Sequence, residues 1–208
     1  MTQVKQWLSG ISKVRLILVV GLIVIGLGLI VFFGGRAFNS FRQLQYIHEQ
    51  GLDNGTASVD AVQPWMTIRF IAVAYAVPEE YLYSQLNVPF DRRNANSPLG
   101  QLNRDYDLGM SPNGDYPAIL DKARAAISAY RANPVITGLR EVRAWMSIQY
   151  IANSTGVPAD YLMKAIGMKS DQVNKPLEIW VDETHYYGGP KAVSDNLQGA
   201  LDRYGAAP

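Results

Sequence analysis

The stretch Trp65-Met66-Thr67-Ile68-Arg69-Phe70-Ile71-Ala72 occurs twice in this chain. Eighty positions later the sequence is Trp145-Met146-Ser147-Ile148-Gln149-Tyr150-Ile151-Ala152. Each stretch leads to a Val-Pro pair and then a Tyr-Leu pair, at residues 77–82 and 157–162. Repetition at a fixed offset is the sequence signature of repeated structural units. We therefore expect two related folding units in tandem.

Each copy predicts a short helix, a tight turn and a second short helix. Thr67 and Ser147 have hydroxyls suited to an N-cap, where they accept a backbone N–H of the next turn. Apolar residues recur at helical spacing after each cap. Pro78 and Pro158 suit the first position of the second helix, where a missing N–H costs nothing. This spacing resembles the helix-turn-helix motif and, more loosely, the central part of peptidoglycan-binding LysM modules.

The duplication extends over the whole C-terminal part. Because each copy is predicted to be helical, the predicted fold class is all-α. Repeat 1 is assigned to residues 58–134 and repeat 2 to residues 135–208, each with a longer helix near its end. Long irregular loops are expected at 91–116 and 178–189. The core of the two repeats is predicted to consist of aromatic and branched residues at matched positions: Trp65, Ile68, Ile71, Tyr81, Trp145, Ile148, Ile151 and Tyr161.

Repeat 1 resembles a small helical module attached to bacterial membrane-bound redox proteins. The module has the form Met-Thr-x-x-x-Ile-Ala-x-x-Tyr-Gly-Val-Pro-x-x-x-Leu, then Asn-x-Pro-Leu-Gly-x-Leu-x-x-x-Tyr. The matching residues are Met66, Thr67, Ile71, Ala72, Tyr75, Val77, Pro78, Leu82, Asn96, Pro98, Leu99, Gly100, Leu102 and Tyr106. Ala76 replaces the glycine of the pattern; repeat 2 has Gly156 there but loses the Pro-Leu-Gly continuation. The resemblance implies an appendage to a membrane assembly.

A charge-free segment of twenty residues lies between Arg15 and Arg36. As a helix it would span about 30 Å, the thickness of the hydrocarbon core of a bilayer. We therefore predict a short basic N-terminus and a transmembrane helix within residues 1–35, followed by an amphipathic stalk and linker at 36–57. Three basic residues precede the segment, so the positive-inside rule favours a cytoplasmic N-terminus and a periplasmic C-terminal domain.

Two faces of this N-terminal part are predicted to contact membrane partners or lipid. Small residues spaced by seven would let another membrane helix approach closely: Gly21, Gly28 and Gly35. Apolar residues at helical spacing would give the stalk one contact face: Phe38, Phe41, Leu44 and Ile47.

Composition argues against most chemistry. The chain of 208 residues has no cysteine and only two histidines, so thiolate catalysis, iron–sulfur ligation and a haem or zinc site are not expected. Residues 36–208 carry 16 basic and 18 acidic residues, a balance unlike that of nucleic-acid-binding proteins. No phosphate-binding glycine loop or nucleophile–base pair is found. We expect no catalytic residue, cofactor, metal ion, small-molecule substrate or nucleic-acid partner.

The functional hypothesis is a non-catalytic, single-pass accessory subunit of a bacterial inner-membrane complex. Its partners would be integral membrane subunits, soluble subunits and the lipid bilayer, and the resemblance points to a respiratory or photosynthetic electron-transfer complex. Two alternatives stay open: an envelope protein with LysM-like peptidoglycan-binding repeats, and a membrane-anchored DNA-binding regulator. A candidate protein interface is the aromatic group Trp180, His185, Tyr186 and Tyr187.

The glycine stripe gives a direct test. Gly28→Leu would place a large side chain on the predicted helix contact and should lower co-purification with membrane partners, since close helix packing needs small residues there. Recovery of partners from membranes, quantified against the unchanged chain, measures this effect. Equal recovery would contradict a helix contact at Gly28.

Overall fold

The computed structural model describes residues 21–22, 25–26 and 42–205, apart from the side chain of Arg92. Within these residues the fold is all-α, as predicted, and β-structure is limited to isolated bridges. The chain divides into two units, residues 1–47 and 48–208. Both repeats belong to the second unit.

In the first unit, residues 21–22, 25–26 and 42–47 are helical. Leu44 is exposed and Ile47 is half-buried. No helix within the described ranges has the length and apolar character needed to cross a bilayer. Most of the predicted membrane segment lies outside the described residues, as do the predicted contacts Gly28, Gly35, Phe38 and Phe41.

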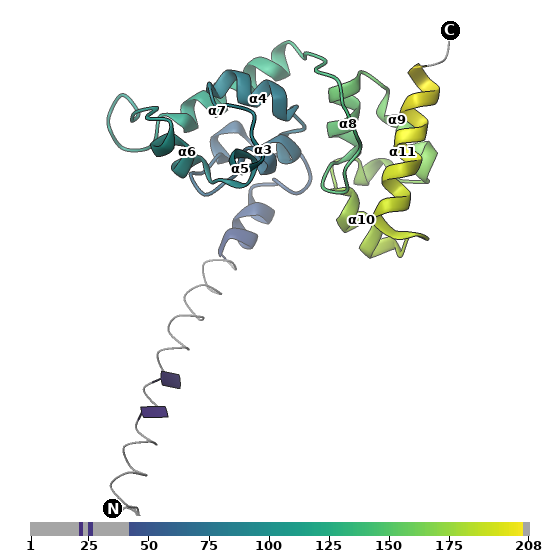
Figure 1. The fold of residues 1–208 in the computed structure, drawn as a ribbon, viewed down its shortest axis with the longest axis horizontal. Helices are drawn as coiled ribbons and strands as arrows, with labels where there is room; N and C mark the ends of the chain where they lie inside the picture. The colour runs from purple at the N-terminus through teal and green to yellow at the C-terminus, as the bar shows by residue number, and fades with distance from the viewer. Residues whose placement is uncertain (1–20, 23–24, 27–41, 206–208) are drawn as a thin grey trace, which may run out of the picture. The chain divides into compact units, whose positions relative to one another are not determined.

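The two repeats contain corresponding helices in the same order. Figure 1 shows α3–α7 in one group and α8–α11 in a second. Repeat 1 contains η1 (Val59–Ala61), α3 (Ile68–Tyr75), α4 (Glu79–Leu86), α5 (Arg92–Asn96), α6 (Leu99–Asp105) and α7 (Ile119–Ala132). Repeat 2 contains α8 (Ile148–Thr155), α9 (Ala159–Ile166), η2 (Ser170–Gln172), α10 (Leu177–Thr184) and α11 (Gly189–Gly205). The long helix closes each repeat, with α7 packed on α4 and α11 on α9.

The predicted N-caps are confirmed in both copies. The Thr67 hydroxyl accepts the N–H of Phe70, and the Ser147 hydroxyl accepts the N–H of Tyr150. Pro78 and Pro158 are the N-caps of α4 and α9, one position before the predicted place. Helix ends commonly shift by one residue, so the helix–turn–helix assignment holds.

The same backbone hydrogen bond holds the start of α6 in repeat 1 and the start of α10 in repeat 2. Leu99 N–H donates to Met66 C=O in repeat 1, and Leu177 N–H donates to Met146 C=O in repeat 2, each at 2.8 Å. Both methionines are buried, at 0 % and 4 % exposure. The same hydrogen bond occurs in both copies. The Pro-Leu pair that the two repeats share in sequence therefore marks the start of α6 in repeat 1 and of α10 in repeat 2.

The core differs from the prediction in its aromatic members. Ile68, Ile71, Ile148 and Ile151 are at most 1 % exposed. By contrast, the four predicted core aromatics Trp65, Tyr81, Trp145 and Tyr161 are only half-buried. Each packs against one neighbouring ring in a tilted or edge-on arrangement. Indole N–H and phenol O–H groups need polar partners, so edge positions suit them better than a dry centre.

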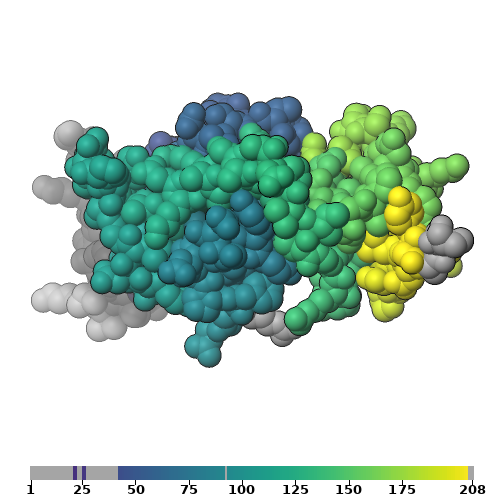
Figure 2. All heavy atoms as spheres, turned by 90° about the horizontal axis from the view of Figure 1, so that it is seen from above, coloured from purple at the N-terminus to yellow at the C-terminus, as the bar shows by residue number. Residues whose placement is uncertain are grey.

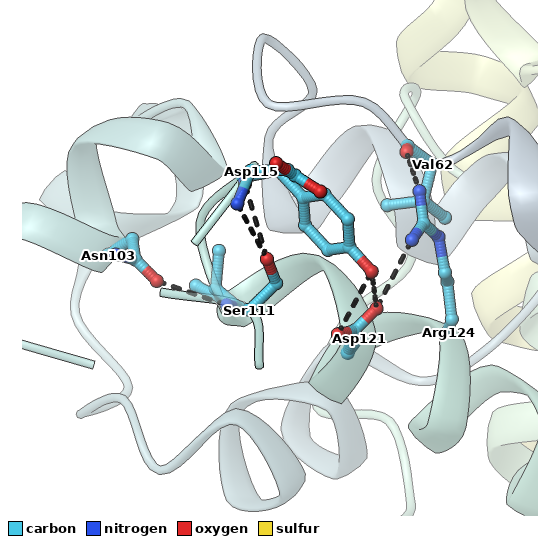
Figure 3. Close-up of polar contacts among 8 residues, drawn as sticks. Val62, Asn103, Ser111, Asp115, Asp121 and Arg124 are labelled. Atoms are coloured by element: carbon cyan, nitrogen blue, oxygen red, sulfur yellow. Dashed lines mark hydrogen bonds and ion pairs between the residues drawn. The ribbon is translucent and has the colours of Figure 1, made fainter. Parts of the chain in front are cut away.

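The stretch 91–116 was predicted to be irregular, but it contains α5 and α6. The remaining loop before α7 is held by its own hydrogen bonds, shown in Figure 3. Ser111 Oγ accepts the N–H groups of Asp115 and Tyr116, and Asn103 Oδ1 accepts the N–H of Ile119 at the start of α7. These bonds satisfy the polar groups of the loop internally and give it a structural role.

The stretch 178–189 was likewise predicted to be a loop presenting aromatic rings. Instead α10 covers Leu177–Thr184 and turns Trp180 inward, where it is 3 % exposed and donates from Nε1 to Gln172 Oε1. Tyr186 packs half-buried on that indole, while His185 and Tyr187 are exposed. The prediction that Trp180 belongs to an exposed aromatic interface is therefore wrong, because its position on α10 directs the side chain into the core.

The turn between the first two helices gives a test in both copies. Ala76 has φ 52° and Gly156 has φ 74°, a left-handed conformation that costs a residue with a Cβ about 1–2 kcal/mol. Allowing for the greater chain entropy of glycine, Ala76→Gly should raise the free energy of unfolding by about 0.5–1 kcal/mol.

The reverse change, Gly156→Ala, should lower stability, and its Cβ would also lie 2.6 Å from Ile136 Cδ1. Thermal and urea unfolding followed by circular dichroism would measure both variants. If neither variant differed from the unchanged chain in its free energy of unfolding, the assigned backbone strain would be contradicted.

Candidate functional site

A groove of about 1100 Å³ lies where the two repeats meet. Helices α3 and α4 of repeat 1 form one wall, and the segment between α7 and α8 forms the other; we call this segment, residues 133–147, the linker. Figure 2 shows the blue-teal surface of repeat 1 bordering the green linker. The lining residues used below are Arg69, Glu79, Tyr83, Phe90, Arg140, Arg143, Trp145 and Tyr150.

An ion pair between the first two helices lies in this groove. Arg69 is the second residue of α3 and Glu79 the first of α4, so the turn between these helices brings them together. Arg69 Nε donates to Glu79 Oε1 at 3.0 Å, and the Glu79 side chain is 7 % exposed. Burial raises the pKa of the Glu79 carboxyl, and the Arg69 charge opposes that rise only in part.

Repeat 2 covers the ion pair. The Glu79 N–H donates to the hydroxyl oxygen of Tyr150 at 3.3 Å, and the Arg69 guanidinium lies 4.9 Å from the centre of the Trp145 ring. Next to them, Asn153 Nδ2 donates to the Ala76 carbonyl at 2.6 Å. The α3–α4 corner of repeat 1 is thus held by side chains of α8 and its preceding residues. Trp145 acts through a cation–π contact and ring packing.

Tyr83 is the buried polar residue of the groove that lacks a partner. Its side chain is on α4, the residue is 3 % exposed, and its hydroxyl makes no hydrogen bond to any described residue. Burial raises the pKa of the Tyr83 phenol well above its usual value, and the nearby Glu79 carboxylate adds to the rise. The phenol therefore stays protonated at neutral pH and is a potential donor. Its ring packs edge-on against Phe90, which is 63 % exposed.

The linker leaves much of its backbone unpaired. Gly138 N–H donates to Ser154 C=O, and Val142 N–H donates to Gln198 Oε1. Between these two points, the N–H groups of residues 139–141 donate to no acceptor within the described part of the chain. The same three residues line the groove.

The two repeats differ at the polar positions of the groove. At the offset of eighty, Arg69 corresponds to Gln149 and Glu79 to Ala159. Tyr83 corresponds to Met163, which is also buried, at 7 % exposure. An apolar side chain thus meets the needs of the fold at this position in repeat 2. The hydroxyl of Tyr83 is an addition found in repeat 1, and buried polar groups without partners call for an explanation.

This set of groups is suited to binding. Its lining combines aromatic side chains with a balance of three arginines and three glutamates: Arg69, Arg140, Arg143, Glu79, Glu80 and Glu141. Among the residues that the structure describes, no three His, Asp or Glu side chains lie close enough to hold a metal ion.

Of the site residues predicted from sequence, Trp145 lines the groove, whereas Trp180, His185, Tyr186 and Tyr187 do not. Sequence reasoning missed Arg69, Glu79, Tyr83 and Tyr150. A position-by-position comparison of the two copies could have found them. Such a comparison picks out positions where one copy has a polar or charged side chain and the other has an apolar or neutral one. Comparison of the chain with protein-family models, curated proteins and solved structures gave no match.

Tyr83→Phe tests whether the hydroxyl serves the fold. Because a buried hydroxyl without a partner costs about 1–3 kcal/mol, its removal should leave the free energy of unfolding unchanged or raise it by about 1 kcal/mol. Tyr161→Phe is the matched control in repeat 2, since that hydroxyl donates to the Ala200 carbonyl. The control should lose about 0.5–1.5 kcal/mol in urea unfolding. A comparable loss for Tyr83→Phe would show an intramolecular partner for its hydroxyl.

Glu79→Gln tests the buried carboxyl through pH. The pKa of Glu79 in the folded chain lies above the usual value of 4.5, so the folded state holds this proton more tightly than the unfolded state. Stability attributable to Glu79 should therefore fall as the pH rises from 4.5 through the folded pKa. Relative to wild type, the Gln variant should gain stability over that interval, measured by unfolding at several pH values. A difference independent of pH would contradict the raised pKa.

Proposed function

We propose that this protein is a non-catalytic accessory subunit, anchored in a bacterial membrane by one N-terminal helix, that docks onto other subunits through its paired helical repeats. The observation that carries the proposal is the groove at the contact of the repeats, where a buried phenol has no partner among the residues that the structure describes. The charge-free segment between Arg15 and Arg36 supports the anchor.

The kind of complex follows from the resemblance of repeat 1 to modules of membrane-bound redox proteins. On that basis we place the protein in an electron-transfer complex of the inner membrane. The basic residues before the anchor support a cytoplasmic N-terminus and a periplasmic pair of repeats.

No structural observation favours the two alternatives. In the DNA-binding hypothesis, the N-terminus of the second helix of the motif must be exposed so that it can contact base edges. In repeat 1 this position is Glu79, which is 5 % exposed and bonded to Tyr150; in repeat 2 the exposed Asp160 would meet phosphates with a negative charge. The LysM resemblance requires flanking strands, whereas the segments beside α3 and α8 form the isolated bridges Thr67↔Pro98 and Ser147↔Pro176.

The decisive experiment is mild detergent extraction of the full chain from its own membranes, followed by native electrophoresis and identification of co-migrating subunits. We expect integral and soluble subunits at fixed stoichiometry, with haem or iron–sulfur absorbance in the same band. A chain that migrates alone in detergent, or that turns over a substrate unaided, would contradict the proposal. Retention on isolated cell wall would favour the LysM alternative, and salt-sensitive retention on DNA would favour the regulator.

A further inference from the structure

Asparagine followed by glycine is the least hindered setting for attack of the main chain on a side-chain amide, because glycine has no Cβ to obstruct the approach. Hydroxide removes the proton of the glycine N–H, and the nitrogen bonds to the asparagine Cγ. The intermediate takes a proton from water and expels ammonia, and a second water opens the resulting cyclic imide. The chain contains two such pairs, Asn54-Gly55 and Asn113-Gly114, and both asparagines are exposed.

The side-chain amide of Asn54 is held ready for this attack. Its Oδ1 accepts two hydrogen bonds from Thr56, one from the backbone N–H at 3.1 Å and one from the hydroxyl at 2.6 Å. The backbone bond forms an Asx-turn, which folds the amide back along the main chain beside Gly55. Both donors polarise the amide C=O and stabilise the negative charge that Oδ1 gains when Cγ is attacked.

Two glycines complete this arrangement. A Cβ on Gly51 would collide with the Thr56 hydroxyl, so the missing side chain lets that hydroxyl reach Asn54. The N–H of Gly55 donates to no acceptor among the residues that the structure describes. No hydrogen bond therefore has to break before this nitrogen loses its proton.

The second Asn-Gly pair lacks these features. The N–H of Gly114 donates to Ser111 C=O at 2.8 Å, so its proton is already engaged in a turn. The side chain of Asn113 accepts no hydrogen bond from the described part of the chain. Its amide is therefore less activated, although the dipeptide is the same.

We propose that Asn54 is a site of spontaneous deamidation, which the Thr56 hydroxyl accelerates, and that the products are aspartate and isoaspartate. The inference does not depend on the docking role. It concerns a place where repeat 2 contacts the segment before repeat 1: Asn174 Nδ2 donates to Asn54 C=O at 3.0 Å. A Cβ on Gly55 would lie 2.6 Å from the same nitrogen. Isoaspartate adds one carbon to the main chain and a negative charge here, so it alters this close contact.

The test follows both asparagines in the full chain, purified in detergent and incubated at mildly alkaline pH. Peptide mass spectrometry measures conversion of each amide to an acid, and isoaspartyl methyltransferase labels the isoaspartate. We expect Asn54 to convert several times faster than Asn113. In urea the two rates should become similar, because unfolding removes both turns and glycine follows both residues. Equal rates in the folded chain, or a difference that persists in urea, would overturn the inference.

Thr56→Val separates the hydroxyl from the backbone donor, because it removes the first and keeps the second. Loss of one stabilising hydrogen bond should slow conversion of Asn54 by about twofold to tenfold and leave Asn113 unchanged. Thr56→Ser keeps the hydroxyl and should keep the rate of the unchanged chain. Equal or faster conversion of Asn54 in Thr56→Val also overturns the inference, since the hydroxyl would then only restrain the amide.

Discussion

The α3–α4 corner of repeat 1 meets repeat 2 around one ion pair, that of Arg69 with Glu79. The Glu79 side chain is 7 % exposed, whereas the Arg69 side chain is 32 % exposed. Burial of the Glu79 carboxylate costs free energy that the Arg69 charge offsets only in part, so the pKa of Glu79 is raised. Tyr150 and Trp145 of repeat 2 contact this corner: the Tyr150 hydroxyl accepts the backbone N–H of Glu79, and the Trp145 ring lies against the Arg69 guanidinium. The charged pair therefore gives the repeats a specific way of meeting, where apolar packing alone would permit several.

The two copies differ in sequence at this contact. Arg69 and Glu79 of repeat 1 stand where repeat 2 has Gln149 and Ala159. In the other direction, Tyr150 and Asn153, which reach across to repeat 1, replace Phe70 and Val73. A single repeat, standing alone, needs none of these polar groups for its own core. The duplicated unit has thus kept its fold and changed the surfaces at which its two copies touch, and the groove formed beside that contact is a property of the pair.

Much of the local structure was predictable from sequence, because it depends on short-range chemistry. Hydroxyl caps at Thr67 and Ser147 and the prolines at 78 and 158 specify where helices begin. The aromatic residues were less predictable. Trp180 was expected on a surface and is buried, while Trp65 and Trp145 were expected in the core and are half-buried. Ring size and hydrophobicity do not determine burial when the polar edge of the ring must also find a partner.

The sequence by itself determined the duplication, the all-α class and the position of the first two helices in each copy, since these follow from periodicity and capping within a few residues of the chain. It also determined the charge-free segment before Arg36. Only the tertiary structure decided that Arg69, Glu79, Tyr83 and Tyr150 share one groove and that the Tyr83 hydroxyl is left without a partner among the described residues. The reason is that burial and hydrogen-bond satisfaction also depend on contacts between residues far apart in the chain, such as Glu79 with Tyr150 and Ala76 with Asn153, which no local pattern records.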